Sequence, residues 1–299
     1  MISRVGFIGF GEVGEYFARD LIALGVGHIA AFDIANAPDG KPAGRAAKLG
    51  VRLCASPAEA LEGAELIFCC VTAGSDVQAA GDASPAIPPG AFWVDVNSVS
   101  PGTKKEVAAI VGAAGGRFVE AAVMSSVPPH GLASPMLLGG PHARDFIAAA
   151  DGLRMDLTFR SETIGVASAV KMCRSVMIKG IEALTTESML AARHYGVERE
   201  VLASLSDTIP HPDWPKLARY VMSRALIHGR RRAEEMREVA RTVAEAGVSP
   251  MLAGPTAQRQ DWAADRGAEL GPTLLAEASL EEILDALLAR RVALGADLK

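Results

Sequence analysis

Three glycines near the start of the chain constrain its fold more than any other feature. Gly9, Gly11 and Gly14 stand in the spacing GxGxxG within "GFIGFGEVG", after the apolar run "RVGFI" and before the helix-like "EVGEYFARDL". In a strand–turn–helix of this kind the first glycine permits a tight turn, the second lets a pyrophosphate approach, and the third lets helix and strand pack closely. The cofactor contacts expected at this turn are Gly9, Phe10, Gly11, Glu12, Val13 and Gly14. A glycine-rich turn without a ligand is the alternative.

A carboxylate at the end of the next apolar run bears on which cofactor binds. Asp33 closes "HIAAFD", where it can accept hydrogen bonds from the adenosine ribose and repel a 2′-phosphate. NAD is therefore expected, with NADP possible because Lys41 and Arg45 follow in the adjoining loop. Thr72, directly after "ELIFCCV", is a further expected cofactor contact.

Apolar runs and helical segments alternate over about the first 150 residues. The runs are "RVGFIGF", "HIAAFD", "ELIFCCV", "AFWVDV" and "GRFVEAAV", with alanine-rich segments such as "EYFARDLIALG" between them. This order predicts an α/β fold, a Rossmann-like doubly wound parallel sheet covered on both faces.

After about Gly165 the strand signal stops. A run of about thirty residues without proline, "GVASAVKMCRSVMIKGIEALTTESMLAARHYG", predicts one long helix, and further helices follow to the end of the chain. We expect a nucleotide-binding domain over 1–163, an interdomain helix over 164–195, and an all-helical substrate and dimerisation domain over 196–299.

Composition narrows the kind of partner. The 299 residues carry a net charge of −5, which argues against nucleic-acid binding because phosphate recognition needs concentrated positive charge. No apolar run reaches the roughly 18 residues of a membrane span, and the N-terminal stretch lacks the apolar core of a signal peptide. Cys54, Cys69, Cys70 and Cys173 show no metal-site spacing and are expected as reduced, buried thiols. We expect a cytoplasmic protein with a small-molecule substrate, no metal, no nucleic acid and no membrane partner.

The long helical run carries three cations in an otherwise small and apolar segment. They are Lys171, Arg174 and Lys179, within "GVASAVKMCRSVMIKG". Partial burial and a neighbouring cation both disfavour a charged amine, which would suit Lys171 to proton transfer. The alternative is a lysine that merely extends to solvent from a packed helix.

Three stretches together resemble the β-hydroxyacid dehydrogenases, the family of 3-hydroxyisobutyrate and 6-phosphogluconate dehydrogenases. They are the glycine motif, "DVNSVSP" at 95–101, and "GVASAVKMCRS". The segments "KMCRS" and "HGRRRAEEM" are most similar to a branch whose C-terminal helical domain is a domain of unknown function. The resemblance spans most of the chain and implies an NAD(P)-dependent oxidoreductase acting on the hydroxyl of a β-hydroxyacid or related alcohol. It also implies that Lys171 is the catalytic acid/base and that the chain forms a homodimer.

The chain departs from that family around the expected substrate. The family's two asparagines after the lysine are replaced by Arg174 and Ser175, and its serine and two glycines by Met124, Ser125 and Ser126. In "DVNSVSP", Asn97 and Ser98 replace a serine and a threonine, and are expected to face cofactor and substrate. The substrate contacts expected in these segments are Asn97, Ser98, Ser125, Ser126 and Ser175.

A later segment, "HGRRRAEEM", offers a substitute for the missing anion cradle. His228, Arg231, Arg232 and Glu235 share one helix face, and arginine binds carboxylates through paired N–H donors. His228, Arg231 and Arg232 are therefore further substrate-binding candidates. The alternative is a solvated face on which Glu234 and Glu235 neutralise the arginines.

Two other functions remain open. An imine reductase shares the fold and the glycine motif but usually lacks the helix lysine, so Lys171 favours alcohol chemistry. A dinucleotide-binding protein without turnover would bind the cofactor and transfer no hydride.

Overall fold

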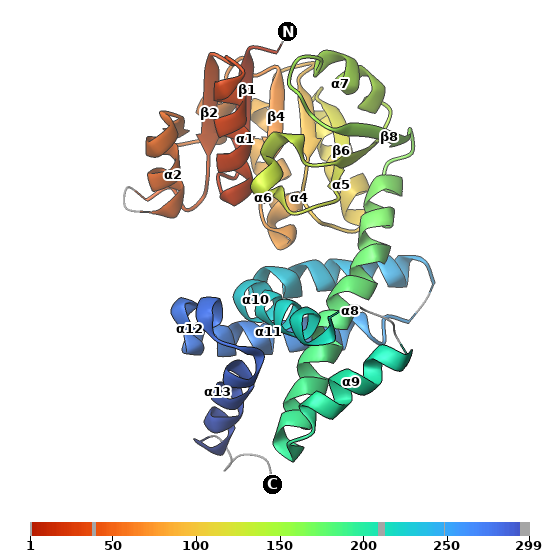
Figure 1. Ribbon diagram of the computed structural model, residues 1–299. Coiled ribbons are helices and arrows are strands. Elements are labelled where there is room, and N and C mark those ends of the chain that lie inside the picture. Colours follow the sequence, from red (N-terminus) through yellow and green to blue (C-terminus); the bar gives the residue numbers. More distant parts are fainter. Residues whose placement is uncertain (1, 38–39, 209–212, 248, 294–299) are drawn as a thin grey trace. The chain divides into compact units, whose positions relative to one another are not determined.

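The computed structural model describes residues 2–37, 40–208, 213–247 and 249–293 (Figure 1). The chain divides into two compact units. The first comprises residues 1–173 with 241–247, and the second comprises 174–240 with 248–299. This division falls inside the long helix, whereas the sequence-based boundaries set residues 164–195 apart as a linker.

An eight-stranded sheet forms the centre of the first unit. Its strands are β1 (Arg4–Ile8), β2 (His28–Phe32), β3 (Arg52–Cys54), β4 (Leu66–Cys69), β5 (Phe92–Asp95), β6 (Arg117–Val123), β7 (Met136–Gly139) and β8 (Leu157–Ser161). The strand order is β3-β2-β1-β4-β5-β6-β7-β8. Neighbouring strands are parallel except β6 and β7. There Val123 pairs with Met136, so β7 runs opposite to β6 and the two strands need no crossover helix between them.

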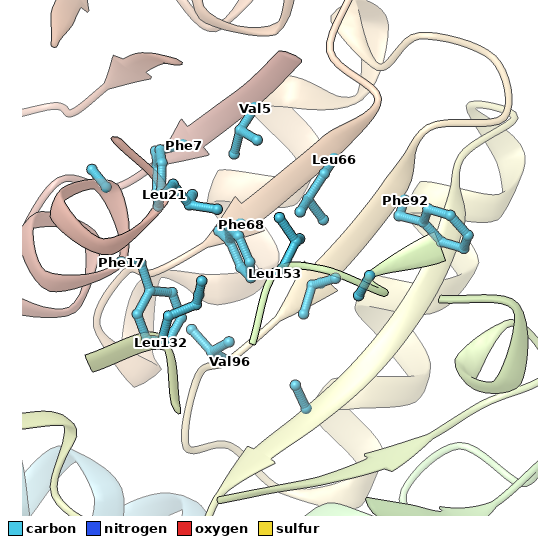
Figure 2. Close-up of a cluster of buried hydrophobic side chains, with 14 of the residues drawn as sticks. Val5, Phe7, Phe17, Leu21, Leu66, Phe68, Phe92, Val96, Leu132 and Leu153 are labelled. Atoms are coloured by element: carbon cyan, nitrogen blue, oxygen red, sulfur yellow. The ribbon is translucent and has the colours of Figure 1, made fainter. Parts of the chain in front are cut away.

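Both faces of this sheet are buried, as the predicted fold class requires. Phe7 and Phe68 stack on one face at a ring separation of 5.5 Å, in the cluster shown in Figure 2. Ile67 and Trp93 belong to a separate cluster with Val107 of α5. Because side chains alternate along a strand, adjacent residues 67 and 68 face opposite layers. The predicted doubly wound α/β fold is confirmed, with one antiparallel pair added.

The helices of the first unit connect successive strands. They are α1 (Glu12–Ala23), α2 (Lys41–Leu49), α3 (Pro57–Leu61), α4 (Asp76–Ala83), α5 (Pro101–Ala113), α6 (Val127–His130) and α7 (Ala143–Ala149). Two of them begin with a serine followed by proline: the Ser56 hydroxyl accepts from the N–H of Glu59, and that of Ser100 from Thr103. Such caps satisfy amides that the first helical turn leaves without a carbonyl partner.

The described part of the chain after residue 161 contains helices and no strand. They are α8 (Val166–Tyr195), α9 (Glu198–Thr208), α10 (Trp214–Glu245), α11 (Ala253–Leu270), α12 (Pro272–Glu277) and α13 (Leu280–Ala293). The predicted long helix is confirmed as the 30 residues of α8. Close packing of α10 on α11 requires glycines, because a Cβ at Gly267 would lie 2.1 Å from the carbonyl oxygen of Leu226. Met222, Leu226 and Ile283 lie in the core of this unit.

The four cysteines are free thiols. Cys54 and Cys69 are buried and Cys70 is partly buried, but Cys173 is exposed. The expectation that all four are buried is therefore wrong for Cys173, which lies on an outward face of α8 beside the exposed Arg174. Among the described residues, no helix is long and apolar enough to cross a membrane, and no cluster of metal-ligating side chains forms.

Candidate functional site

The glycine loop lies at the carboxyl end of β1, where open α/β sheets bind their ligands. Gly9 has φ +85°, and a Cβ there would lie 2.5 Å from the carbonyl oxygen of Cys70. A Cβ at Gly14 would lie 3.2 Å from the carbonyl oxygen of Gly9, so α1 packs closely on the turn. Gly11 is the N-cap of α1, and a Cβ there would have no atom within 4 Å. The loop thus has open space at Gly11, where a phosphate would approach the helix N-terminus.

Asp33 is bonded directly to this loop. Its Oδ2 accepts a hydrogen bond from the N–H of Phe10 at 2.7 Å, and its Oδ1 accepts from the N–H of Ala35 at 2.8 Å. The side chain is half-buried. A carboxylate offers about four acceptor positions, so two remain for ribose hydroxyls. Asp33 therefore fits a role in holding both the glycine loop and an adenosine ribose.

The cations suggested for a 2′-phosphate differ in their availability. Arg45, on α2, donates from Nε to the Glu15 carboxylate on α1 at 2.8 Å. Lys41, at the start of α2, is exposed. Because Arg45 already has a carboxylate partner, binding a phosphate with it would require Glu15 to be displaced.

The first turn of α1 and the loop after β4 complete the expected cofactor contacts. Glu12 is exposed and Val13 is partly buried at the start of α1, where backbone N–H groups lack intrahelical partners. Thr72 is exposed, and its hydroxyl lies 3.1 Å from that of Ser75. These residues stand at the same sheet edge as Gly9 and Asp33, after β1, β2 and β4.

The loop after β5 is more buried than the sequence suggested. The two amide hydrogens of Asn97 face Asp76 Oδ1 at 2.8 Å and Cys69 Sγ at 3.3 Å. Its donors are thus directed into the domain, which leaves Ser98, partly exposed, as the more accessible polar side chain of this loop. The next serine, Ser100, donates to Glu245 at 2.8 Å.

Ser125 and Ser126 are exposed after β6. The Ser125 hydroxyl donates to the carbonyl oxygen of Ser126 at 3.1 Å, and Ser126 is the N-cap of the short helix α6. Their side chains are solvent-accessible, as a substrate contact requires.

Lys171 lies in the second turn of α8 and is partly buried. The start of that helix is held by Glu120 of β6, which is fully buried. Glu120 Oε2 accepts from the N–H of Gly165 at 2.8 Å, and Oε1 accepts from the N–H of Ser168. A carboxylate at a helix N-terminus satisfies free amides and the helix dipole together. Glu120 therefore fixes the start of the helix, one turn before Lys171.

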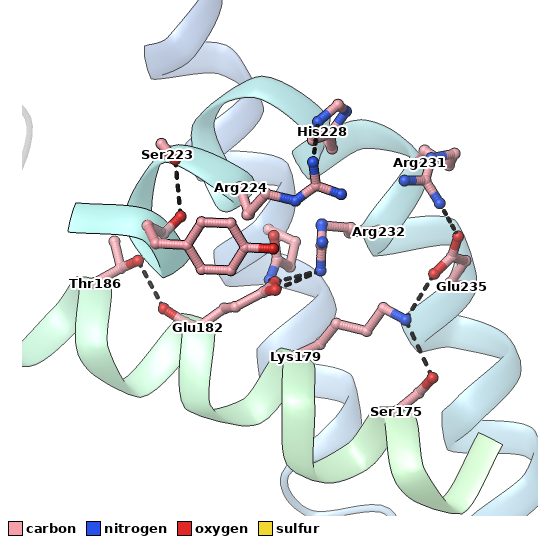
Figure 3. A network of polar contacts seen from close by, with 12 residues as sticks. Ser175, Lys179, Glu182, Thr186, Ser223, Arg224, His228, Arg231, Arg232 and Glu235 are labelled. Atoms are coloured by element: carbon pink, nitrogen blue, oxygen red, sulfur yellow. Dashed lines mark hydrogen bonds and ion pairs between the residues drawn. The ribbon is translucent and has the colours of Figure 1, made fainter. Parts of the chain in front are cut away.

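In the second unit, Ser175 and Arg231, both expected as substrate contacts, take part in a network of hydrogen bonds and ion pairs (Figure 3). The Ser175 hydroxyl accepts from Lys179 Nζ at 3.1 Å, and this amine lies 2.8 Å from Glu235 Oε2. Glu235 also pairs with Arg231. Lys179 and Glu235 are buried, so this pair is part of the core of the helical unit and not a solvated surface.

The face of α10 that carries His228, Arg231 and Arg232 is partly buried in the same core. Arg232 is buried and pairs with Glu182 of α8, which Gln260 of α11 also contacts at 3.2 Å. His228 Nε2 lies 2.9 Å from Arg224 Nη1. Burial and the nearby arginines lower the pKa of His228 to about 4. His228 and the half-exposed Arg231 stay accessible, whereas Arg232 would have to leave Glu182 to bind a substrate.

Several structurally important charges escaped the sequence interpretation. Asp95 and Glu120 each stand alone in an apolar run, "AFWVDV" and "GRFVEAAV", and a single carboxylate in a buried strand was a usable signal. Lys104 and Glu182 stand in ordinary helical segments, where nothing in the pattern distinguishes a buried charge from an exposed one.

Two family models match the chain. Residues 4–149 match the NAD binding domain of 6-phosphogluconate dehydrogenase, and residues 192–263 match a domain of unknown function, DUF1932. A solved structure of a conserved hypothetical protein from Sinorhizobium meliloti is 33% identical, covers 97% of each chain and superposes with a TM-score of 0.71. The chain belongs to the β-hydroxyacid dehydrogenase superfamily.

Other relatives agree with this membership of the β-hydroxyacid dehydrogenase superfamily. A conserved protein of unknown function, described as structurally similar to 3-hydroxyacid dehydrogenases, is 31% identical over 88% of this chain and 97% of its own, with a TM-score of 0.67. The mitochondrial 3-hydroxyisobutyrate dehydrogenase of Drosophila melanogaster is 26% identical over 71% of this chain and 65% of its own length. The first domain of this superfamily member is thus an NAD(P)-binding domain, and its second contains the domain of unknown function that the resemblance predicted.

Proposed function

We propose that this chain is an NAD(P)-dependent dehydrogenase acting on the hydroxyl group of a β-hydroxyacid or a related alcohol. The observation that carries the proposal is the placement of Lys171, which the resemblance matches to the family's catalytic lysine, on a helix whose start is fixed by the buried Glu120. An amine held on a rigid element is suited to general acid–base catalysis, which needs precise geometry. Membership of the superfamily supports the same reaction class.

The glycine loop supports the cofactor part of the proposal. Open space at Gly11 and the free amides of the first turn of α1 suit a pyrophosphate, and Asp33 suits a ribose diol. Asp33 is negatively charged and Arg45 is paired with Glu15, so we infer a preference for NAD over NADP. The residues present therefore fit a nicotinamide dinucleotide.

The reaction divides between the cofactor and the chain. A nicotinamide held by the glycine loop and Asp33 would supply the hydride acceptor for the carbon that carries the hydroxyl group. In its neutral form, Lys171 takes the proton of the substrate hydroxyl group as the O–H bond breaks, and the product is a carbonyl compound. Ser98, Ser125 and Ser126 are accessible hydrogen-bond partners for the substrate. Arg231 is a cationic candidate for its carboxylate, and His228, whose pKa is lowered to about 4, is a candidate hydrogen-bond partner in its neutral form. In the reverse direction Lys171 returns the proton to the carbonyl oxygen.

An assay of cofactor reduction tests the proposal. Purified protein would be given NAD or NADP with a panel of β-hydroxyacids, sugar acids and alkyl or aryl alcohols, and reduced cofactor would be followed by absorbance. We expect turnover of at least one hydroxyacid or alcohol, faster with NAD. Reduction of cyclic imines without alcohol oxidation would favour an imine reductase, and cofactor binding without any turnover would favour a non-catalytic binding protein. Either result would overturn the proposal.

We also propose that the chain pairs with a second copy through α8. Met177, Ile181 and Leu184 follow one another at helical spacing and are exposed, Met177 by 64% and Leu184 by 68%. Burying such a stripe against a partner is favourable because it removes apolar surface from water. Sedimentation at micromolar concentration should give the mass of a dimer, and a stable monomer would contradict the pairing.

A further inference from the structure

A group of buried polar side chains lies beneath the nucleotide-binding edge of the sheet. Asp95 ends β5, Asp76 begins α4, Lys104 lies in the first turns of α5, and Asn97 lies in the loop after β5. Asp76, Asp95 and Lys104 are at most 1% exposed, and Asn97 is 6% exposed. Charged groups this deeply buried are rare unless they are paired, so the partners within the group show which charges are compensated.

Lys104 is bound to Asp95 alone among the described carboxyl groups. Its Nζ lies 2.9 Å from Asp95 Oδ1 and donates to the Asp95 carbonyl oxygen at 2.9 Å. Asp95 Oδ1 also accepts from the backbone N–H of Asn97 at 2.9 Å. One carboxylate oxygen thus receives both a cation and an amide.

Asp76 is connected to the group through Asn97. The Asn97 side-chain amide donates to Asp76 Oδ1 at 2.8 Å. The thiol of Cys69 lies 3.7 Å from the same oxygen. Asp76 therefore sets the direction of the Asn97 side chain, and Asp95 sets the position of its backbone.

One oxygen of each carboxyl group lacks a donor. Asp76 Oδ2 and Asp95 Oδ2 are both buried, and neither has a hydrogen-bond partner among the described residues. Two ionised carboxyls beside a single ammonium would also leave one uncompensated negative charge in the core, which is costly. A proton held between the two carboxyl groups removes both difficulties, as in carboxylate pairs that share a site.

The surrounding groups agree with a neutral Asp76. Burial and the charge of Asp95 raise the pKa of Asp76 well above its usual range. Burial likewise raises the pKa values of the thiols of Cys69, which ends β4, and of Cys70, which follows it, so neither thiol is charged at neutral pH. From β6, the carboxylate of Glu120 is bonded to the amides that begin α8. Lys104 is the cation of the group, and Asp95 is its counter-ion.

We propose that Asp76 is a neutral carboxylic acid that shares one proton with Asp95, and that the group Asp76, Asp95 and Lys104 positions Asn97 and its loop at the cofactor edge. The shared proton makes the group electrically neutral, with Lys104 and Asp95 as its only charges. Asp76 is a positioning residue, because the contacts of its carboxyl group are with Asn97 and Cys69 and not with substrate or cofactor. The effect of the loop on cofactor binding rests on the function proposed above; the shared proton does not.

The test compares two substitutions that differ only in which partner loses its acid group. Asp76→Asn keeps an N–H donor toward Asp95 and an oxygen acceptor toward Asn97, so the unfolding equilibrium constant should change by less than about threefold. Asp95→Asn removes the counter-ion of the buried Lys104, so that constant should rise by about a hundredfold or more. Asp82→Asn, at an exposed position of α4, is the matched control and should have no effect.

Infrared spectroscopy at neutral pH observes the proton directly. The carbonyl band of a protonated carboxylic acid should be present in the wild-type protein, absent in Asp76→Asn and unchanged in Asp82→Asn. Equal destabilisation by Asp76→Asn and Asp95→Asn, or no acid band that Asp76→Asn removes, would overturn the shared proton.

Cofactor binding tests the positioning role separately. Asp76→Leu cannot accept a hydrogen bond from Asn97 and should weaken NADH binding by about tenfold. Asp76→Asn keeps an acceptor and should bind NADH about as tightly as the wild type. If Asp76→Leu does not fold, NADH affinity equal to wild type in Asp76→Asn supports positioning, and a loss there refutes it. Wild-type protein that does not bind NADH would refute the proposed function while the spectroscopic and unfolding results still stand.

Discussion

The carboxylate of Glu120 accepts a hydrogen bond from the backbone N–H of Gly165 at 2.8 Å, and so joins strand β6 to the start of helix α8. Gly165 has φ +101°, and a Cβ there would lie 3.0 Å from Cβ of Pro101. The helix that carries Lys171 therefore begins at a site defined by the sheet, although its later turns belong to the helical unit.

Glu120→Gln should destabilise the protein by about 1–3 kcal/mol, because an amide directs an N–H group at one of the two buried backbone donors. Chemical denaturation followed by circular dichroism would measure this loss. Glu162→Gln is the control, since Glu162 is exposed three residues before Gly165. Equal stability of the two variants would show that the carboxylate does not hold the helix.

Lys171→Ala should reduce turnover by about a hundredfold or more while leaving NADH affinity close to that of the wild type, as expected for loss of a general acid–base. Lys171→Arg should be nearly as inactive, because a guanidinium does not give up its proton. Steady-state kinetics with a substrate found in the assay above would measure both.

The choice of control for Lys171 depends on the structure. Lys179 is buried between Ser175 and Glu235, so its removal would disturb folding. Lys216 is exposed on α10, and Lys216→Ala should keep full activity. Normal turnover by Lys171→Ala would contradict the proposed mechanism.

Asp33→Ala should raise the dissociation constant for NADH by about tenfold or more, since the ribose acceptor and the bond to the Phe10 amide are both lost. The ratio of NADH affinity to NADPH affinity should also fall toward one. Asp33→Asn keeps an acceptor oxygen but not the charge, so it should narrow the ratio with a smaller loss of NADH affinity. Fluorescence titration with both cofactors measures these constants, and an unchanged ratio would refute the role of Asp33 in selectivity.

Two arginines of α10 should differ sharply in their effect on stability. Arg232 is buried against Glu182, so Arg232→Met leaves a buried carboxylate without its cation and should cost about 3 kcal/mol. Arg230 is 61% exposed and pairs with Asp261 and Asp265, so Arg230→Met should cost less than about 1 kcal/mol. Similar losses in thermal or chemical denaturation would mean that the buried pair does not stabilise the helical unit.

His228 should make the stability depend on pH. Its pKa of about 4 in the folded protein lies below the value of about 6.5 for an unperturbed histidine. Between these pH values the unfolded chain binds a proton that the folded chain does not. The contribution of neutral His228 to the free energy of unfolding is therefore complete above about pH 6.5 and declines as the pH falls toward 4. His228→Gln should remove this decline. Denaturation at several pH values would show it, and parallel curves for the two proteins would contradict it.

The sequence alone was sufficient for features that depend on local pattern. Glycine spacing around Gly9, Gly11 and Gly14 predicted the turn and its open phosphate position, because each of the three has a local reason. Gly9 has a positive φ, a Cβ at Gly14 would crowd the carbonyl oxygen of Gly9, and a Cβ at Gly11 would occupy the open space. Short apolar runs predicted five of the strands, and a run of about thirty residues without proline predicted the long helix α8. Three strands were missed. β3 has only three residues, β7 has four and is antiparallel to β6, and β8 is partly exposed, so each lacks the long apolar run of a central parallel strand.

Only the tertiary structure decided which charges are buried and with whom they pair. Lys104 with Asp95, and Arg232 with Glu182, are side chains from different elements, and the sequence contains no local sign of either pair. The same applies to Asn97, whose amide is directed at Asp76 and Cys69 because these lie on neighbouring elements. A charged or polar side chain is stable in a core only where a partner from another segment reaches it, and that proximity is created by folding itself.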